Sequence, residues 1–386
     1  MATGVDRVER AYLTHLAGRR EPLFAIARTA LGYVLLDAAG AAAIAERAAG
    51  AVPWGAADTL SRGLRGVPQA VRRAESDLRR MALARCLPVG LPHMLARHLP
   101  QGTAYLNVGH SNLTERMLQG ARRAIGARVS VLLHDVIPLD FPQYQRPGTP
   151  ETFRAMLRRV AAGAGLVICN TAHTRQRAAA HMQRWGALPR LVVAHLGVPV
   201  PIPGALPAGV DPARPRFVTL GTIEPRKGHD LLLDVWQQMQ TDLGAATPQL
   251  LICGARGWNN KPVFDRLDAL RPGGAVREMP GLPDAQIAAL LAGSRGLLFP
   301  SRAEGFGLPA AEAAALGVPV VCSDLPAIRE VLGDIPVYAN ETDRYQWRNA
   351  IESLTKGREQ ESQAAAKSVF APPTWADHFN TVLRFT

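Results

Sequence analysis

The 386-residue chain has few cysteines, few aromatic residues and no long uninterrupted apolar run. Its longest uncharged apolar stretch, residues 191–210, contains four prolines and therefore cannot form a membrane-spanning helix. The N-terminus lacks a basic patch followed by an apolar run, so we expect no secretory signal. The scattered cysteines form no CxxC pair and have no histidine at ligand spacing, which argues against a zinc site or a disulfide framework and fits a reducing cytoplasm: Cys86, Cys169, Cys253 and Cys322.

Lysine is absent from the first 200 residues, which carry 26 arginines, 12 acidic residues and a net charge of +14. The remaining residues carry 18 basic and 20 acidic side chains, so the two halves are expected to meet different partners. No aromatic residues interleave with the basic excess and no nucleic-acid-binding motif appears, so nucleic acid is not the expected partner. Hydrophobic residues make up 47% and charged residues 20%, a globular composition that excludes a disordered or fibrous chain.

Short continuous apolar runs alternate with helical segments along most of the chain. Such runs are typical of parallel strands that are buried on both faces, and their alternation with helices predicts doubly wound α/β sheets. The expected strands are 104–108, 129–134, 166–170, 191–195, 216–220, 249–253, 296–299 and 318–322. The clearest expected helices are 230–240, 284–292 and 310–316.

Seven prolines between residues 189 and 215 indicate a linker. We therefore predict a Rossmann-like domain over residues 1–198, a proline-rich linker over 199–215 and a second Rossmann-like domain over 216–370. Ligands of open α/β sheets bind at the carboxyl ends of the strands, so the central cleft that the two domains face is the expected site. The start is unusual, because a glycine turn runs into a helix within residues 1–10 with no strand before it.

Two cations follow one predicted strand in the second domain. In the stretch FVTLGTIEPRKGHDLLL, Arg226 and Lys227 lie between the end of a strand and the start of a helix. A guanidinium, an ammonium and free helical N–H groups together form a good anion site. The alternative is a solvated basic turn.

Two carboxylates, Glu304 and Glu312, are separated by seven residues in the stretch FPSRAEGFGLPAAEAAALG. Between them, Gly305 and Gly307 flank Phe306 and would let a ligand approach the backbone closely. Paired carboxylates suit the vicinal hydroxyls of a sugar. The alternative is that Glu304 caps the following helix and Glu312 lies on its solvent face.

In combination, these loops resemble the retaining GT-B glycosyltransferases of glycosyltransferase family 4. The EX7E spacing of the two glutamates and the sequence EPRKG carry the resemblance, and further pieces are similar to family segments: GARGW at 254–258, PGLPDAQIAALL at 280–291, SDLPAIRE at 323–330, the His134-Asp135 loop and Gly4 in TGVDRVE. The resemblance covers most of residues 100–340. It implies that residues 1–198 bind the acceptor, that 216–370 bind the nucleotide sugar and that a helix within 371–386 crosses back to the first domain.

The resemblance also implies a role for each matching residue. Arg226 and Lys227 would bind the donor diphosphate and stabilise its leaving charge. Glu312 would bind the ribose and Glu304 the sugar hydroxyls. The remaining donor contacts would come from Gly305, Phe306, Gly307 and Gly4, with Gly4 letting its loop approach the phosphates.

The resemblance implies that His134 reaches the sugar from the opposite domain. A near-neutral pKa would suit His134 to acid–base work, and Asp135 is a candidate nucleophile or base. A lone histidine is, however, more often structural. Such enzymes usually retain the anomeric configuration and need no metal, and no convincing DxD motif is present here.

Arginines cluster over residues 62–97, and Arg72, Arg73, Arg79 and Arg80 recur at nearly helical spacing. An amphipathic basic helix suggests peripheral contact with an anionic membrane surface, at the cytoplasmic face. The alternative is a solvated helix face in an arginine-rich protein.

The leading hypothesis is the transfer of a sugar, mannose from GDP-mannose, to a glycan or lipid-linked acceptor in bacterial surface-polysaccharide assembly, without a cofactor. UDP-sugars stay open as donors. A nucleotide-sugar epimerase of the same fold and a non-catalytic polyanion-binding protein are the alternatives.

Overall fold

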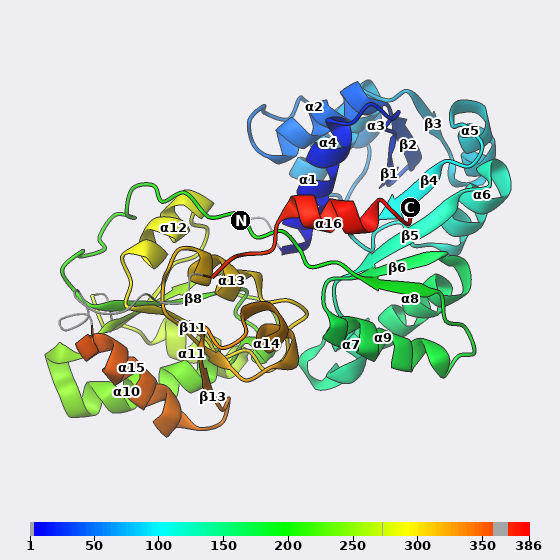
Figure 1. Cartoon of the computed structure of the whole chain (residues 1–386). Coiled ribbons are helices and arrows are strands. Elements are labelled where there is room, and N and C mark those ends of the chain that lie inside the picture. Colours follow the sequence, from blue (N-terminus) through cyan, green and yellow to red (C-terminus); the bar gives the residue numbers. More distant parts are fainter. Residues whose placement is uncertain (1–3, 272, 358–369) are drawn as a thin grey trace.

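The computed structural model describes residues 4–271, 273–357 and 370–386, which form two α/β halves side by side (Figure 1). The N-terminal half, residues 4–198, holds a four-stranded parallel sheet and a three-stranded antiparallel sheet. The C-terminal half, residues 216–357, holds one six-stranded parallel sheet. This confirms the predicted class of two Rossmann-like α/β units.

The parallel sheet of the N-terminal half has the strand order β4-β5-β6-β7. Its central strands are almost completely buried because helices cover both faces. The strands are β4 (Ala104–Asn107), β5 (Arg128–Leu133), β6 (Leu166–Cys169) and β7 (Arg190–Val193). The helices that follow or connect them are α6 (Glu115–Ile125), α7 (Ile137–Asp140), α8 (Thr149–Gly163) and α9 (Ala172–Gln183).

The first hundred residues fold in a way that the apolar runs did not predict. They begin with α1 (Gly4–Ala17), and β1 (Ala25–Thr29), β2 (Gly32–Leu36) and β3 (Ala84–Cys86) then form an antiparallel sheet separate from the parallel one. Only β2 is buried along its whole length, which explains why its neighbours carry a weak apolar signal. The helices of this region are α2 (Ala38–Ala48), α3 (Thr59–Arg62), α4 (Gln69–Arg80) and α5 (Leu91–His98).

The sheet of the C-terminal half has the order β10-β9-β8-β11-β12-β13, so β8 and β11 are neighbours at its centre. Its strands are β8 (Arg216–Leu220), β9 (Gln249–Cys253), β10 (Val276–Glu278), β11 (Gly296–Phe299), β12 (Val320–Ser323) and β13 (Val337–Ala339). Its helices are α10 (His229–Leu243), α11 (Lys261–Asp268), α12 (Asp284–Ala292), α13 (Leu308–Ala315), α14 (Pro326–Leu332) and α15 (Arg344–Gly357). Every predicted strand is present to within two residues at each end.

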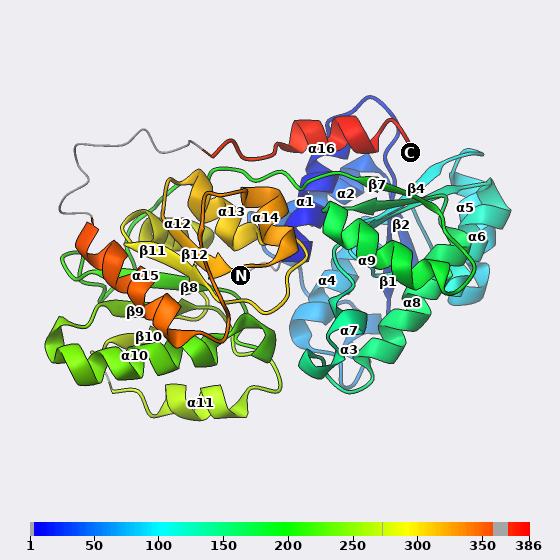
Figure 2. The same ribbon diagram turned by 60° about the horizontal axis from the view of Figure 1, so that its bottom comes forward.

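The proline-rich stretch 199–215 contains neither helix nor strand, and it runs along the outside of the C-terminal half, where the Gly204 N–H donates to the carbonyl oxygen of Ala285 (Figure 2). Beside it lies α16 (Trp375–Val382), which packs on α1 of the N-terminal half: the Tyr12 hydroxyl lies 2.7 Å from Nε2 of the buried His378. The Val198 N–H donates to the carbonyl oxygen of Pro373. The chain therefore starts in the N-terminal half, passes through the C-terminal half and returns.

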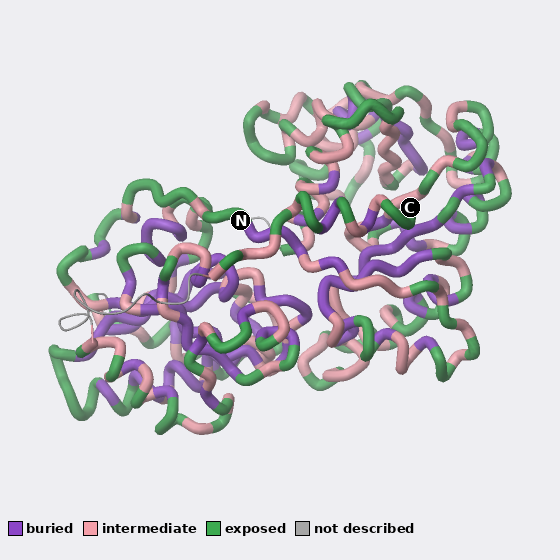
Figure 3. Tube along the Cα trace, viewed as in Figure 1, coloured by how far each residue is buried: buried purple, intermediate pink, exposed green. Residues whose placement is uncertain are grey.

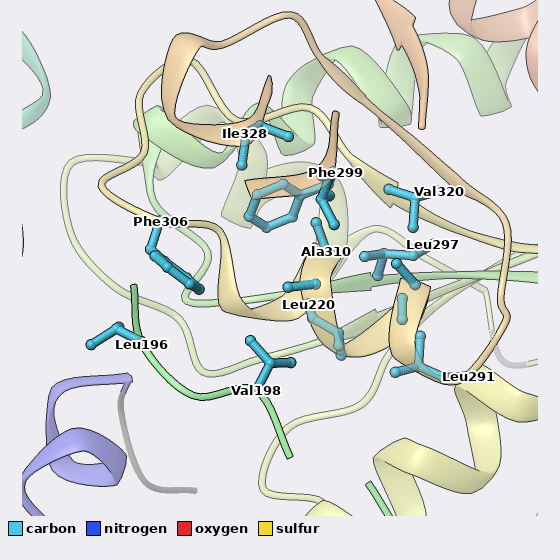
Figure 4. Packing of buried hydrophobic residues seen from close by; sticks show 14 of the residues in the cluster. Leu196, Val198, Leu220, Leu291, Leu297, Phe299, Phe306, Ala310, Val320 and Ile328 are labelled. Atoms are coloured by element: carbon cyan, nitrogen blue, oxygen red, sulfur yellow. The ribbon is translucent and has the colours of Figure 1, made fainter. Parts of the chain in front are cut away.

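One apolar cluster continues across the junction of the two halves. It includes Val8 and Leu196 from the N-terminal half together with Phe299 and Phe306 from the C-terminal half. Figure 4 shows Phe306 beside Leu196, on the segment that leaves the N-terminal half. Buried positions thus run through the centre of each sheet and along the junction, whereas exposed positions lie on the outer turns (Figure 3).

Helix α4 does not present the free basic face that its spacing suggested. The buried Arg79 is paired with Asp58 at 2.9 Å, Arg73 donates to the carbonyl oxygens of Gly55 and Trp54, and Arg80 is paired with Asp77. These arginines tie α4 to the loop before α3 because that loop offers carbonyl oxygens and a carboxylate. The buried Arg79 therefore belongs to neither a membrane-binding face nor a solvated one, and Arg73 is half-buried; membrane contact itself stays a prediction. Among the described helices, none is long and apolar enough to cross a membrane.

Candidate functional site

Arg226 and Lys227 lie in a tight 3₁₀ turn, Pro225–Lys227, between β8 and α10. The turn ends at Gly228, whose φ is +67°, and a Cβ there would lie 2.2 Å from the carbonyl oxygen of Pro300. Only glycine fits this position, so the turn can pack directly on the loop after β11. A backbone hydrogen bond stabilises the contact: the main-chain N–H of Arg302 donates to the carbonyl oxygen of Arg226 at 2.8 Å. The two motif loops therefore meet at the carboxyl ends of neighbouring strands.

The two cations share acidic partners in this contact. Lys227 Nζ donates to Glu304 Oε1 at 2.6 Å, and Arg226 Nη1 lies 3.3 Å from the same oxygen. Arg226 Nη2 donates to Glu224 Oε1 at 2.6 Å. All four side chains are at most 18% exposed. The predicted solvated basic turn is thus excluded: the cluster is a buried, charge-balanced network.

The electrostatics of the network keep the glutamate charged. Burial lowers the pKa of Lys227, although Glu304 opposes that effect. Burial alone would raise the pKa of Glu304, but the charges of Lys227 and Arg226 hold it below its ordinary value. An incoming phosphate would compete with Glu304 for cations that are already fixed in place, which is the preorganisation that charge stabilisation needs.

The Glu304–Gly307 loop lies at the junction of the two halves. A Cβ on Gly305 would lie 2.3 Å from the carbonyl oxygen of His134, so the loop can touch the N-terminal half only because this residue is glycine. The Thr171 hydroxyl donates to the Gly305 carbonyl oxygen at 3.1 Å. Gly307, with φ at +86°, is the N-cap of α13. Glu304 therefore does not cap this helix, and the capping alternative is wrong.

Glu312 points inward from α13 rather than into solvent, because its side chain is only 9% exposed. Burial raises its pKa, and the charge of Arg7 opposes that shift. Arg7 lies in α1 and pairs through Nη2 with Glu312 Oε1. The solvent-face alternative is thus wrong, and the second glutamate of the EX7E pair is held by the opposite half.

His134 and Asp135 follow β5 and face the C-terminal half. His134 Nε2 lies 2.6 Å from the carbonyl oxygen of Val108; since a carbonyl can only accept, this nitrogen carries the proton. Burial lowers the pKa of His134 and raises that of Asp135, while the charge of Arg226 acts in the opposite direction on the Asp135 carboxyl. The structure thus brings this loop up to the Arg226–Glu304 network.

Phe306 is placed differently from the expectation, whereas the predicted role of Gly4 stays a prediction. The Phe306 ring is 5% exposed and packs in the apolar cluster, with its centroid 6.2 Å from that of His195. Any contact of Phe306 with a donor would therefore come from its backbone, because burial of the ring in the core is more favourable than exposure. Gly4 opens α1, and a Cβ there would lie 3.6 Å from Leu308 Cδ1, at the start of α13.

Several residues at the junction were missed in the sequence. The Glu330 carboxylate of α14 accepts hydrogen bonds from the N–H groups of Ala172 and His173, at 2.6 and 3.0 Å, and lies 2.9 Å from His195 Nε2. It thereby caps α9 of the other half. Glu330 ends the quoted SDLPAIRE segment, but nothing local in the sequence identifies its partner.

The GARGW turn of residues 254–258 also contacts the N-terminal half. Trp258 Nε1 donates to the carbonyl oxygen of Tyr144 at 3.0 Å, and the guanidinium of Arg146 lies over the Trp258 ring at 4.9 Å. Neither partner was predicted. In the described part of the chain, no cluster of three or more His, Cys, Asp or Glu side chains could hold a metal. The expectation that no metal is needed stays a prediction.

Residues 208–368 match the family model described as Glycosyl transferases group 1. The match covers most of the C-terminal half, and it agrees with the resemblance that the motifs of this half carry.

Curated relatives include the serotype-specific mannosyltransferase WbdA of Escherichia coli, 32% identical over 229 residues that cover 54% of this chain and 27% of WbdA. The O-antigen chain mannosyltransferase B of Escherichia coli is 36% identical over 124 residues, which cover 32% of each chain. This chain therefore matches only about a quarter to a third of the length of these relatives.

Solved structures share the fold over most of the chain. Anabaena HepE, in complex with UDP and glucose, superposes with a TM-score of 0.56 at 16% identity and covers 76% of both chains. An α,α-trehalose-phosphate synthase of Burkholderia xenovorans superposes with a TM-score of 0.57 at 12% identity, over 100% of this chain and 92% of its own. These neighbours are GT-B glycosyltransferases, so the expected GT-B architecture is confirmed.

Proposed function

We propose that this chain is a retaining glycosyltransferase that moves a hexose from a nucleotide sugar to a glycan or a lipid-linked saccharide. The observation that carries the proposal is the network of Arg226, Lys227 and Glu304 at the carboxyl ends of β8 and β11. Two fixed cations beside an ionised carboxylate provide separate contacts for a diphosphate and for sugar hydroxyls. The group 1 match over the same residues supports this assignment.

Mannose, from GDP-mannose, is the proposed sugar. The support comes from the relatives, several of which are named mannosyltransferases: WbdA, O-antigen chain mannosyltransferase B and RfbU. By the same names, the proposed setting is the assembly of a bacterial surface polysaccharide or lipopolysaccharide. The donor is a substrate in this proposal, and no cofactor is invoked.

In the proposed reaction, Arg226 and Lys227 bind the diphosphate and stabilise the charge that develops as the bond to the sugar breaks. Glu312 accepts hydrogen bonds from the ribose, and Glu304 from the sugar through the oxygen that Lys227 does not occupy. His134 and Asp135 approach the sugar from the N-terminal half. With Nε2 bonded to Val108, the nitrogen of His134 that can accept a proton is Nδ1.

The N-terminal half is the proposed acceptor side, working in the cytoplasm at the inner face of the membrane. Its basic surface lies away from α4: a hollow between α6 and α8 is lined by Arg122, Arg123 and Arg159, and an adjoining hollow by Arg158 and Arg184. The arginines among these that are exposed would attract anionic headgroups or a pyrophosphate-linked acceptor: Arg122, Arg123, Arg158 and Arg184.

The test is a transfer assay with GDP-mannose and UDP-glucose, using a synthetic lipid-linked disaccharide as acceptor, with the product anomer read by NMR. We expect an α-linked product from the α-linked donor. Glu304→Gln should lower turnover at least about 100-fold while far-UV circular dichroism and a cooperative unfolding transition show that the fold is kept, at a lower midpoint because a buried ion pair is broken. Glu46→Gln, a substitution of the same type at an exposed position, is the control. An inverted product, or full activity in Glu304→Gln, would overturn the proposed reaction.

A further inference from the structure

The Arg7–Glu312 pair joins the first helix of the chain to the helix that carries the second EX7E glutamate. Arg7 projects from α1 in the N-terminal half and Glu312 from α13 in the C-terminal half. The start of α1 also lies next to the first turn of α13, since a Cβ added to Gly4 would lie 3.6 Å from Leu308 Cδ1. The contact is therefore part of a packed junction and not a chance meeting of two long side chains.

The surroundings of Glu312 make a cationic partner necessary if it is to stay ionised. Its side chain is 9% exposed, whereas that of Arg7 is 33% exposed and so keeps part of its hydration. Burial raises the pKa of Glu312, and the negative charge of Asp284, at the start of α12, acts in the same direction. Arg7 is the group that opposes both effects. A protonated Glu312 would present one oxygen as a donor and would bind ribose hydroxyls less well.

We propose that Arg7 is a positioning residue for nucleotide binding, which holds Glu312 as an oriented, anionic acceptor for the ribose hydroxyls. This inference rests on the proposed function, because it takes Glu312 as the ribose-binding group. It adds that recognition of the ribose requires both halves: the acceptor oxygen comes from the C-terminal half, but the charge that keeps it an acceptor comes from the N-terminal half. Ribose recognition is thereby coupled to contact between the halves.

The experiment compares the binding of GDP and of 2′,3′-dideoxy-GDP by isothermal titration, with UDP and dideoxy-UDP as a second pair. In the wild-type protein, the ribonucleotide should bind at least about tenfold more tightly than its dideoxy analogue, since hydrogen bonds to a carboxylate are lost. In Arg7→Gln, this ratio should fall to about one to three. Arg7→Lys keeps a cation on a shorter donor and should give an intermediate ratio.

The matched control is Arg10→Gln, which removes the same charge from an exposed position on the same helix and should leave the ratio unchanged. Glu312→Gln should abolish the ratio, and adding Arg7→Gln to it should change nothing further. A purely structural role of Arg7 would weaken both nucleotides equally. If Arg7→Gln keeps the wild-type ratio, or loses both ligands in parallel, the inference is wrong and the proposed function stands. If the wild-type protein binds neither nucleotide pair, the proposed function fails, and the inference fails with it.

Discussion

The two halves of this molecule use charge in opposite ways. In the C-terminal half, Arg226 and Lys227 follow one strand, and both point at Glu304 in the loop after the next strand of the sheet. In the N-terminal half, Arg73 and Arg79 bind groups that precede α3, whereas Arg7 pairs with Glu312 of the other half. Charged residues at a strand end thus predict a site, whereas the role of charged residues along a helix depends on partners that the sequence does not identify.

This contrast can be tested most strongly at Lys227. Lys227→Ala removes a fixed cation from the network, and we expect turnover to fall by about 100- to 1,000-fold because charge on the leaving diphosphate is no longer stabilised. The measurement is kcat in the transfer assay. Lys261→Ala is the control, since Lys261 is highly exposed and its ion pair is with Asp265 on its own helix. Equal activity in both variants would show that the network is not the donor site.

The second largest effect is expected in the N-terminal half, and on stability alone. The Arg79 side chain is 4% exposed and bonds Asp58 through two nitrogens, at 2.9 Å each. Arg79→Ala leaves Asp58 without this partner and should cost about 3 kcal/mol of unfolding free energy. Urea unfolding measures the cost, with the exposed Arg65→Ala as the control. Nucleotide affinity should not change; a parallel loss of affinity would contradict the separation of roles between the halves.

A smaller effect is expected at the contact between the halves. Glu330→Gln replaces a carboxylate that accepts two backbone N–H groups of α9, and the amide can accept through only one of its terminal atoms. We expect about 1 kcal/mol less stabilisation of the α9 N-terminus. Hydrogen exchange should show faster exchange at Ala172 and His173. Asp334→Asn, at a fully exposed position nearby, is the control, and equal exchange in the two variants would rule out the cap.

The smallest predicted effect is a pH dependence of stability. The hydrogen bond from Arg79 holds the pKa of Asp58 well below its ordinary value of about 4. A depressed carboxyl pKa contributes stability above the unfolded pKa and loses it as pH falls through the folded pKa. The unfolding free energy should therefore decrease below about pH 4, and less steeply in Asp58→Asn. Urea titrations between pH 3 and 6 measure both slopes, and identical slopes would contradict the assignment.

The parallel sheets could be predicted because their strands are buried on both faces and read as continuous apolar runs. The antiparallel sheet of β1, β2 and β3 could not, since β1 and β3 are only partly buried and carry little apolar pattern. The basic spacing in α4 suggested a free surface because spacing alone does not show which residues the arginines contact. Two partners of Arg79, Asp58 and Ser61, lie some twenty residues earlier, at the N-cap of the short helix α3 and within it.

The residues of the candidate site also divide into those that the sequence predicts and those that it does not. Arg226, Lys227 and Glu304 were predictable because a strand followed by charged and glycine-rich residues places them at one sheet edge. The family resemblance implied that Phe306 contacts the donor, but its ring packs in the apolar cluster at the junction. Arg7, Thr171 and Glu330 could not be found, because each acts on a residue more than 130 positions away along the chain.

The central claim is that the C-terminal half binds the nucleotide of a sugar donor through Arg226 and Lys227. The most direct test is thermal unfolding of the wild-type protein and of Lys227→Ala with GDP, UDP, dTDP and CMP, each with and without Mg²⁺. We predict that one nucleotide series stabilises the wild-type protein increasingly with concentration, without need of metal, and that the shift is lost in Lys227→Ala. An absence of stabilisation by all four nucleotides, or an equal shift in Lys227→Ala, would contradict the claim.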